Sequence, residues 1–283
     1  KRTRGRREMI VGCVVLYQPR EENIQHILQY APLFKTLFVL DNSDTPDVSY
    51  VDALKKAQNV VYLSMGGNMG IAAALRRGLA EAIACGADFC LTMDQDSTFP
   101  IDRMEEIGAY LSRPDVDDYA VIGLNYEGDS DEKGLVEVRT WITSGNFINV
   151  KNYLKTEGFR EELFIDSVDH ELCHQFYKIG KKVAYINEIR IGHSLGELSC
   201  ANFLGRRVSV TNHSPLRYYY RFRNNYVLYR EDREFYSDLH RADVHHKYKI
   251  ILFEKDKREK LRMIRRAIRD AKAGRLGKFR EEV

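Results

Sequence analysis

The sequence predicts an α/β fold built on a mostly parallel sheet flanked by helices, and three observations indicate it. Continuous apolar runs occur at residues 9–17 (MIVGCVVLY), 36–40 (TLFVL), 60–63 and 89–93, as strands buried on both faces require. Stretches with helical spacing of apolar residues separate these runs. Polar side chains follow where the runs end. Such an alternation indicates parallel strands joined by right-handed helical crossovers.

The elements follow this order along the chain. We expect helices at residues 21–31, 52–57 and 71–85. After Pro100 the signals mix, and we expect strands at 119–124 and 183–186, with a helix at 166–177. Residues 247–269 have a helical period of apolar residues among cations, which predicts a C-terminal helical extension.

Composition limits the class of protein. Of 283 residues, 44% are hydrophobic and 30% charged, which is typical of a globular protein. This length allows one large domain with an appendage, or two small domains. The net charge of only +3 gives no sign of a nucleic-acid partner.

Charge is distributed unevenly along the chain. Residues 247–283 hold 14 Lys or Arg against 6 Asp or Glu, whereas residues 1–246 hold 30 basic and 35 acidic side chains. A basic amphipathic tail on an acidic body favours contact with an anionic surface such as a membrane. A solvated helix that clasps the rest of the protein remains the alternative.

The cysteines and apolar runs bear on location. Five cysteines without a CxxC spacing, at positions 13, 85, 90, 173 and 200, favour reduced thiols over a disulfide framework. No apolar run reaches the roughly 18–20 residues that span a bilayer, and the basic start is no convincing signal peptide. We therefore expect a cytoplasmic protein, with a peripheral position on the inner face of the plasma membrane as an option.

Asp94 and Asp96 follow the fourth apolar run, with Gln95 between them. Ligands of parallel α/β sheets bind at the carboxyl ends of the strands. Two carboxylates there can share one divalent cation, since Mg²⁺ and Mn²⁺ prefer oxygen ligands and often bridge to diphosphate. Acidic residues are also common in turns, so this D-x-D pattern is a weak signal alone.

The order of several motifs is more specific. They are residues 14–17 (VVLY) with Pro19, 39–43 (VLDNS), 68–72 (NMGIA), 91–97 (LTMDQDS), 142–146 (ITSGN), 164–171 (FIDSVDHE) and 191–193 (IGH). From about residue 10 to about residue 229 the chain resembles the family 2 glycosyltransferases of the GT-A fold, in particular the rhamnosyltransferase-like branch of bacterial polysaccharide synthesis. The resemblance implies a GT-A domain at residues 1–230, with a nucleotide-binding half at 8–100 and an acceptor half at 101–230. Residues 231–283 would form the basic helical extension.

The resemblance also implies a donor site. Tyr17, Pro19 and Asp41 would hold the nucleotide base, and Asn68 would lie in a donor-binding loop. Asp96 would be the principal ligand of Mn²⁺ or Mg²⁺, with Asp94 nearer the ribose and His193 as a further ligand. Each has a structural alternative: Asp41 can stabilise its own turn, Asn68 can cap a helix, and a lone His is often structural.

Inversion at the sugar requires a base for the acceptor hydroxyl. The resemblance implies Asp169, with Asp166 in reserve, although acidic residues also favour helix N-termini. The chain departs from the family because His174-Gln175 stands where relatives carry Arg, so the residue that positions the base is open.

The acceptor side is less specific. Trp141, Ser144 and Gly145 resemble the wall that meets donor sugar and acceptor, yet a unique Trp is also an ordinary core residue. The segment 217–225 (RYYYRFRNN) has three readings: RNA-like stacking, which the acidic body disfavours; a helix that packs its aromatics; or a phosphate site with Arg217, Arg223 and Asn224.

The sequence thus predicts an inverting, metal-dependent glycosyltransferase. Its donor would be a dTDP- or UDP-sugar, most simply dTDP-rhamnose. Its acceptor would be a glycan or a lipid-diphosphate-linked glycan of a cell-surface polysaccharide such as O-antigen, capsule or cell wall. A metal-dependent nucleotidyltransferase, which would need a glycine-rich loop after the first strand, and a non-catalytic nucleotide- or carbohydrate-binding protein are the alternatives. A homo-oligomer is left open.

Overall fold

The computed structural model describes residues 8–126, 128, 132–193, 199–203 and 206–281, without the side chains of residues 193, 199–203 and 206–209. The chain divides into two compact units. The α/β unit consists of Lys1–Glu161 with Asp169–Ser194, and the helical unit consists of Glu162–Val168 with Leu195–Val283. This division falls earlier than the expected boundary near residue 230, because the helix that ends at Glu231 packs with the C-terminal helices.

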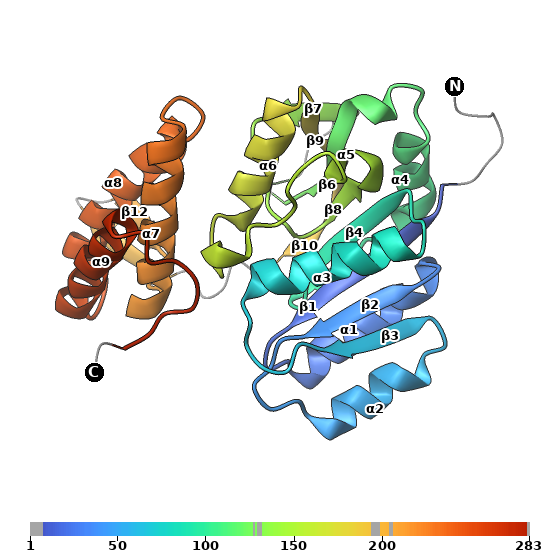
Figure 1. Ribbon diagram of the computed structural model, residues 1–283, viewed down its shortest axis with the longest axis horizontal. Helices are drawn as coiled ribbons and strands as arrows, with labels where there is room; N and C mark the ends of the chain where they lie inside the picture. The colour runs from blue at the N-terminus through green and yellow to red at the C-terminus, as the bar shows by residue number, and fades with distance from the viewer. Residues whose placement is uncertain (1–7, 127, 129–131, 194–198, 204–205, 282–283) are drawn as a thin grey trace. The chain divides into compact units, whose positions relative to one another are not determined.

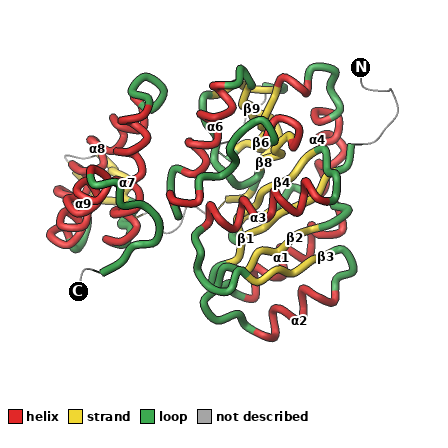
Figure 2. The backbone as a smooth tube through the Cα atoms, in the orientation of Figure 1, coloured by secondary structure: helices red, strands yellow, loops and turns green. Residues whose placement is uncertain are grey.

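An eight-stranded sheet forms the centre of the α/β unit, in the order β3-β2-β1-β4-β8-β6-β9-β7 (Figures 1 and 2). The strands are β1 (Ile10–Leu16), β2 (Leu37–Asp41), β3 (Val60–Ser64), β4 (Phe89–Asp94), β6 (Tyr119–Asn125), β7 (Leu135–Val138), β8 (Asn146–Asn149) and β9 (Lys182–Arg190). The first four pair in parallel, as does β6 with β9, whereas β7 and β8 run antiparallel to their neighbours. The expectation of a mostly parallel sheet is confirmed.

Helices cover the sheet between the strands. They are α1 (Glu21–Tyr30), α2 (Val48–Lys56), α3 (Ile71–Ala84), α4 (Met104–Leu111), α5 (Val150–Tyr153) and α6 (Val168–Lys178). Helix α2 begins four residues before the expected start, because Asp47 caps it by accepting the Ser49 N–H at 2.9 Å. Helix α6 begins two residues late, so Asp166 lies outside it.

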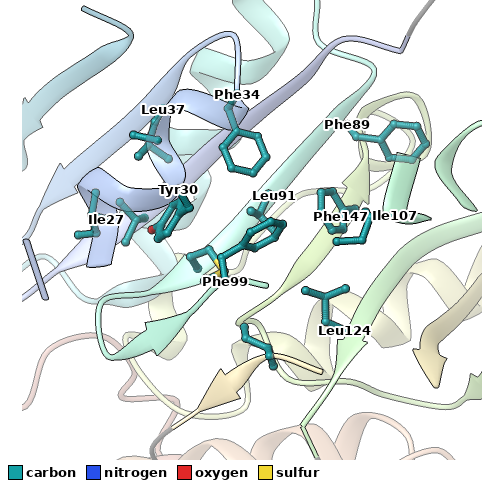
Figure 3. Close-up of a cluster of buried hydrophobic side chains, with 14 of the residues drawn as sticks. Ile27, Tyr30, Phe34, Leu37, Phe89, Leu91, Phe99, Ile107, Leu124 and Phe147 are labelled. Carbon is teal, nitrogen blue, oxygen red and sulfur yellow. The ribbon is translucent and has the colours of Figure 1, made fainter. Parts of the chain in front are cut away.

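The main core packs α1 and α4 against one face of the sheet (Figure 3). Alternate strand residues such as Leu37, Leu91 and Phe147 point into it, and Phe99 joins it edge-on to Phe34 at 5.7 Å between ring centroids. Each such side chain contributes roughly 1.5–3 kcal/mol by leaving water. The opposite side of the sheet meets α3, where a Cβ on Gly78 would lie 2.1 Å from the Cys13 sulfur. Apolar burial on both faces therefore fixes the strand ends that carry the site.

The helical unit holds α7 (Pro215–Glu231), α8 (Ser237–Phe253) and α9 (Lys257–Lys272), with the antiparallel pair β11 (Ser199–Phe203) and β12 (Arg206–Val210). The expected C-terminal helical extension is confirmed, and residues 247–269 are divided between two helices, because the chain breaks after Phe253 and Asp256 takes a left-handed backbone with φ of 52°. Within the described parts of both units, no helix is both long and apolar enough to cross a bilayer.

Candidate active site

The carboxyl ends of β2 and β4 carry the first site residues. In the sheet register Leu16 pairs with Asp41 and Val15 pairs with Asp94, so the two aspartates flank the end of β1. Strands lie about 4.8 Å apart, which puts these two backbones roughly 10 Å from each other. The sheet therefore gathers the predicted donor residues at one edge.

Asp41 is buried and engaged on both carboxylate oxygens. One accepts the Ser43 N–H at 2.9 Å, and the other accepts the Tyr62 hydroxyl at 2.8 Å. Burial raises the pKa of Tyr62, and the hydrogen bond to Asp41 raises it further, so the hydroxyl stays a donor. These bonds orient Asp41 rigidly, which suits both the turn-stabilising and the base-recognition interpretations.

The Ser144 side chain fixes the D-x-D turn through hydrogen bonds to residues on both sides of it. This buried hydroxyl accepts the Asp94 N–H at 3.0 Å and donates to the Ser97 hydroxyl at 2.8 Å. Asp96 is exposed at the tip of the turn. Residues 97–98 (β5, Ser97–Thr98) pair with β10 (Gly192–His193), which places the His193 backbone opposite Ser97. The His193 side chain lies outside the described residues.

Gln95, the central residue of D-x-D, was missed by the sequence analysis. Its amide oxygen accepts the Tyr17 N–H at 2.8 Å, and its amide nitrogen donates to the Tyr17 carbonyl at 3.1 Å. Its own carbonyl accepts from Asn23 at 3.1 Å. Gln95 thus ties the loop after β1, where the exposed Tyr17 and half-buried Pro19 lie, to the aspartate turn. Only its place between two carboxylates could have indicated this.

Asn42 was a second residue without an assigned role. Its side chain accepts the Met69 N–H at 2.8 Å and donates to the side-chain oxygen of Asn68 at 3.4 Å, while that oxygen also accepts the Gly70 N–H at 3.1 Å. The loop before α3 is therefore fastened to the end of β2. Asn68 bonds within this loop and does not cap α3, whose N-cap is Gly70 without a side-chain cap. Its contact with the donor stays a prediction.

Asp169 lies in the first turn of α6 and lines a small cavity. The cavity is also lined by Thr92, two residues before Asp94, and by Thr143. The structure therefore brings the predicted base to the strand that carries the D-x-D turn. Cys173 lines the same cavity, and burial raises the pKa of its thiol to about 12, so it stays protonated and is no nucleophile near neutral pH.

The predicted acceptor wall is built from buried residues. Trp141 is 5% exposed, stacks on Tyr185 with ring centroids 4.0 Å apart and donates to the Leu124 carbonyl at 3.0 Å. Gly145 has a φ of 77°, and a Cβ there would lie 2.8 Å from Ile191, so glycine is required. These residues shape the floor under the site, and direct contact with a sugar stays a prediction.

The remaining acceptor residues lie in the helical unit. The Arg217 guanidinium is 2.6 Å from the Asp166 carboxylate. Arg223 is 1% exposed and donates to the carbonyls of Leu163 and Gly277 at 3.1 and 2.6 Å. Of the three interpretations of this segment, the structure shows the helix that packs its aromatics, and Arg223 is buried with them. An acceptor-phosphate contact by Arg217, Arg223 or Asn224 stays a prediction.

Of the three predicted metal ligands, Asp94 and Asp96 have described side chains and His193 does not. In the described part of the chain, no group of three His, Cys, Asp or Glu side chains is arranged to hold an ion alone. Two carboxylates on an exposed turn nevertheless fit a hard cation whose other ligands come from diphosphate oxygens and water. Such a cation would therefore bind together with the nucleotide.

The fold and these strand ends define the class. The sheet is that of the GT-A glycosyltransferases, and solved structures share it. Residues 1–349 of S. aureus TarS align over 65% of this chain and 59% of that one, with a TM-score of 0.50 and 16% identity. The structure of GalNAc-T7 with UDP, GalNAc and Mn²⁺ aligns over 65% of this chain and 43% of that one, with a TM-score of 0.53 and 11% identity. A second structure of S. aureus TarS aligns over 92% of this chain and 43% of that one, with a TM-score of 0.53 and 13% identity. The chain spans less than two thirds of each of these solved chains.

The family follows from the sequence comparison. The model of Glycosyl transferase family 2 matches residues 21–176, and the chain belongs to this family and is a glycosyltransferase. A dTDP-rhamnosyl transferase, RfbF of Shigella flexneri, is 25% identical over 242 residues, which cover 79% of this chain and 80% of that protein. The resemblance expected from the ordered motifs is thereby confirmed.

Proposed function

We propose that this enzyme transfers rhamnose from dTDP-rhamnose to a hydroxyl of a glycan, with inversion at the anomeric carbon. The identity of its relative as a dTDP-rhamnosyl transferase supports the donor. The observation that carries the mechanism is the gathering of Asp41, Asp94 and Asp169 around the ends of β2 and β4. Each of these carboxylates takes a different role.

On the donor side, Asp41 accepts the N3–H of the base, a role that its rigid carboxylate suits. Asp94 and Asp96 would hold Mn²⁺ or Mg²⁺, which when bound stabilises negative charge on the leaving diphosphate. The Ser144 hydroxyl fixes the turn so that both carboxylates are positioned before the donor arrives.

On the acceptor side, Asp169 takes the proton of the attacking hydroxyl. The hydroxyl oxygen forms a bond to the anomeric carbon as the bond to the diphosphate breaks, and dTDP leaves with the electron pair. Asp166 is the reserve base, but its carboxylate is engaged by Arg217. We therefore assign the proton transfer to Asp169.

We propose a glycan or a lipid-diphosphate-linked glycan of a cell-surface polysaccharide as acceptor, and an anionic membrane as the place of action. Within the expected basic tail, the residues of α8 support such a membrane contact better than those of α9. The apolar side of α9, with Met263, Ile264 and Ala267, is buried. In contrast, α8 exposes one apolar stripe, the α8 stripe, defined as Val244, Tyr248, Ile251 and Leu252 with exposed fractions of 40%, 62%, 47% and 53%. Lys249 and Lys255 beside it suit anionic lipid headgroups.

A donor screen tests the proposal. Thermal stability is measured with dTDP, UDP and GDP in Mn²⁺ and in chelator, followed by release of dTDP from dTDP-rhamnose. We expect the largest shift with dTDP plus Mn²⁺, since a ligand stabilises the state it binds. Asp96→Ala should lose the metal-dependent part, Asp169→Asn should keep it and lose turnover, and the exposed Asp52→Asn should change neither.

Two results would refute the proposal. Native turnover in Asp169→Asn would remove the base assignment. Formation of a nucleotide sugar from a nucleoside triphosphate and a sugar phosphate would instead identify a nucleotidyltransferase.

A further inference from the structure

The segment just before Asp169 has an unfavourable backbone. Phe164, Asp166 and Ser167 have φ values of 66°, 68° and 64°, a left-handed region that non-glycine residues rarely adopt. Three such residues within four positions persist only where surrounding contacts hold them. We call residues 163–168 the strained loop. Its conformation sets the direction in which the chain enters α6.

One side chain of α7 holds most of this loop. The Asn224 amide nitrogen lies 2.9 Å from the Leu163 carbonyl, 2.8 Å from the Ile165 carbonyl and 2.9 Å from the Asp166 carbonyl. Asn224 is fully buried, and its oxygen accepts from Arg223 at 3.0 Å. Three carbonyls converge on one amide only if the chain curls around it, so Asn224 selects the curled form.

Neighbouring residues of α7 hold the rest of the loop. The Ser167 hydroxyl donates to the Asn225 side-chain oxygen, and Arg217 pairs with the Asp166 carboxylate. Positions 224 and 225 are neighbours about two helical turns after 217, so one side of α7 supplies all these contacts.

Gln175, at the position where relatives carry Arg, makes its hydrogen bonds to residues other than Asp169. The Gln175 amide donates to the Glu171 carboxylate at 2.8 and 3.0 Å and to the Gly158 carbonyl at 3.0 Å. Gln175 therefore braces α6 to the segment before the strained loop. The Asp169 carboxylate itself accepts the His170 N–H at 2.8 Å, so its orientation depends on the backbone at the start of α6.

We infer that Asn224 is a positioning residue for Asp169, acting through the strained loop that ends one residue before it. The inference rests on the proposed function, in which Asp169 is the base. In this role Asn224 acts on the backbone and not on the reacting atoms, because it fixes the path of the chain on which the carboxylate is mounted. A displacement of about 1 Å at a base is enough to cost up to about 100-fold in rate.

The test compares two buried asparagines. Asn152 is 1% exposed and donates to the carbonyls of Asp117 and Tyr119, both at 3.0 Å, but it lies in the α/β unit and these bonds involve no residue of the strained loop. Asn224→Ala and Asn152→Ala therefore remove comparable hydrogen bonds. The measurements are thermal stability with dTDP and Mn²⁺, and kcat and KM for release of dTDP from dTDP-rhamnose.

We expect both variants to lose stability and only Asn224→Ala to lose turnover. Its kcat should fall by about 10- to 100-fold with KM for the donor within about twofold of native, the pattern of a misplaced catalytic group. Asn152→Ala should keep kcat within about twofold. Equal kcat in the two variants, or a change confined to KM, would overturn the inference.

A milder variant covers the case in which Asn224→Ala does not fold. Ser167→Ala removes only the bond to Asn225. We expect its kcat to fall by about 3- to 10-fold with an unchanged dTDP-induced thermal shift; native kcat would contradict the inference. Asp169→Asn is measured alongside: if it turns over normally, the proposed function itself fails, whereas an inactive Asp169→Asn with native Ser167→Ala rejects the positioning role alone.

Discussion

The two units of this enzyme have different interiors. The main core of the α/β unit is apolar, and the buried carboxylates of Asp41 and Glu171 lie outside that cluster. The described part of the helical unit buries acidic and basic groups together. Lys260 and Glu254 are 2% and 3% exposed and lie 2.9 Å apart, and Asp270 accepts from both Tyr219 and Arg275.

This difference has a physical consequence. Apolar burial is non-directional and tolerates small shifts, whereas a buried ion pair is stable only while both partners and their hydrogen bonds are present. The apolar core of the α/β unit should therefore tolerate small shifts of its side chains. The helical unit specifies one arrangement of its helices and of the strained loop.

The largest expected effect is loss of the buried cation. In Lys260→Met, the buried Glu254 carboxylate keeps its hydrogen bond from the Tyr218 hydroxyl but loses the Lys260 ammonium group that neutralises its charge. The free energy of unfolding should fall by about 3–5 kcal/mol. Replacing both partners by apolar residues should recover most of this loss. Urea unfolding followed by far-ultraviolet circular dichroism measures both. A double variant no more stable than Lys260→Met would contradict the contrast between the units.

A core substitution should act on the other unit. Leu91→Ala removes a fully buried side chain on β4 and should cost about 3 kcal/mol through lost transfer energy and the cavity. The single tryptophan, Trp141, lies in the α/β unit, so its fluorescence reports on this change. The fluorescence transition should move in Leu91→Ala more than in Lys260→Met; equal shifts would show that both units unfold as one block.

Acid should weaken the helical unit first. Burial, helped by Arg221, lowers the pKa of His246 to about 4 from its ordinary 6.5. The unfolded chain then binds the proton more tightly, so this contribution is complete above pH 6.5 and is lost as the pH falls toward 4. Between pH 7 and pH 5 the loss is about 2 kcal/mol.

The matched variant is His246→Gln, which can still bond the Tyr218 hydroxyl that lies 2.9 Å from the imidazole. Its stability should change less than that of the native protein between pH 7 and pH 5 in urea unfolding. An identical pH dependence would remove His246 as the cause.

The smallest expected effect concerns the α8 stripe. Tyr248→Ser with Ile251→Ser should lower partition onto anionic vesicles about tenfold, equal to about 1.4 kcal/mol of lost apolar contact. Tyr177, which is 62% exposed in the α/β unit, gives the control Tyr177→Ser. Sedimentation with phosphatidylglycerol-containing vesicles measures the partition. Equal binding by the native protein and the double variant would place any membrane contact elsewhere.

Much of the α/β unit could be predicted from local pattern. The apolar runs gave β1 to β4 within one or two residues, and the D-x-D turn follows β4 as expected. The C-terminal extension was harder, because a helical period continues across residue 254 although the chain breaks there. A buried Glu254 paired to Lys260 carries no periodic signal.

The sequence by itself determined the order of strands and helices and the placement of carboxylates at strand ends, because strand and helix periods are local properties of the chain. Only the tertiary structure decided that Gln95 ties two loops together, that Arg223 is buried and that Asn224 curls the strained loop before Asp169. Those bonds join residues about 60 to 80 positions apart. A short polar side chain looks the same in sequence whether it meets water or a distant carbonyl, so packing alone distinguishes the two.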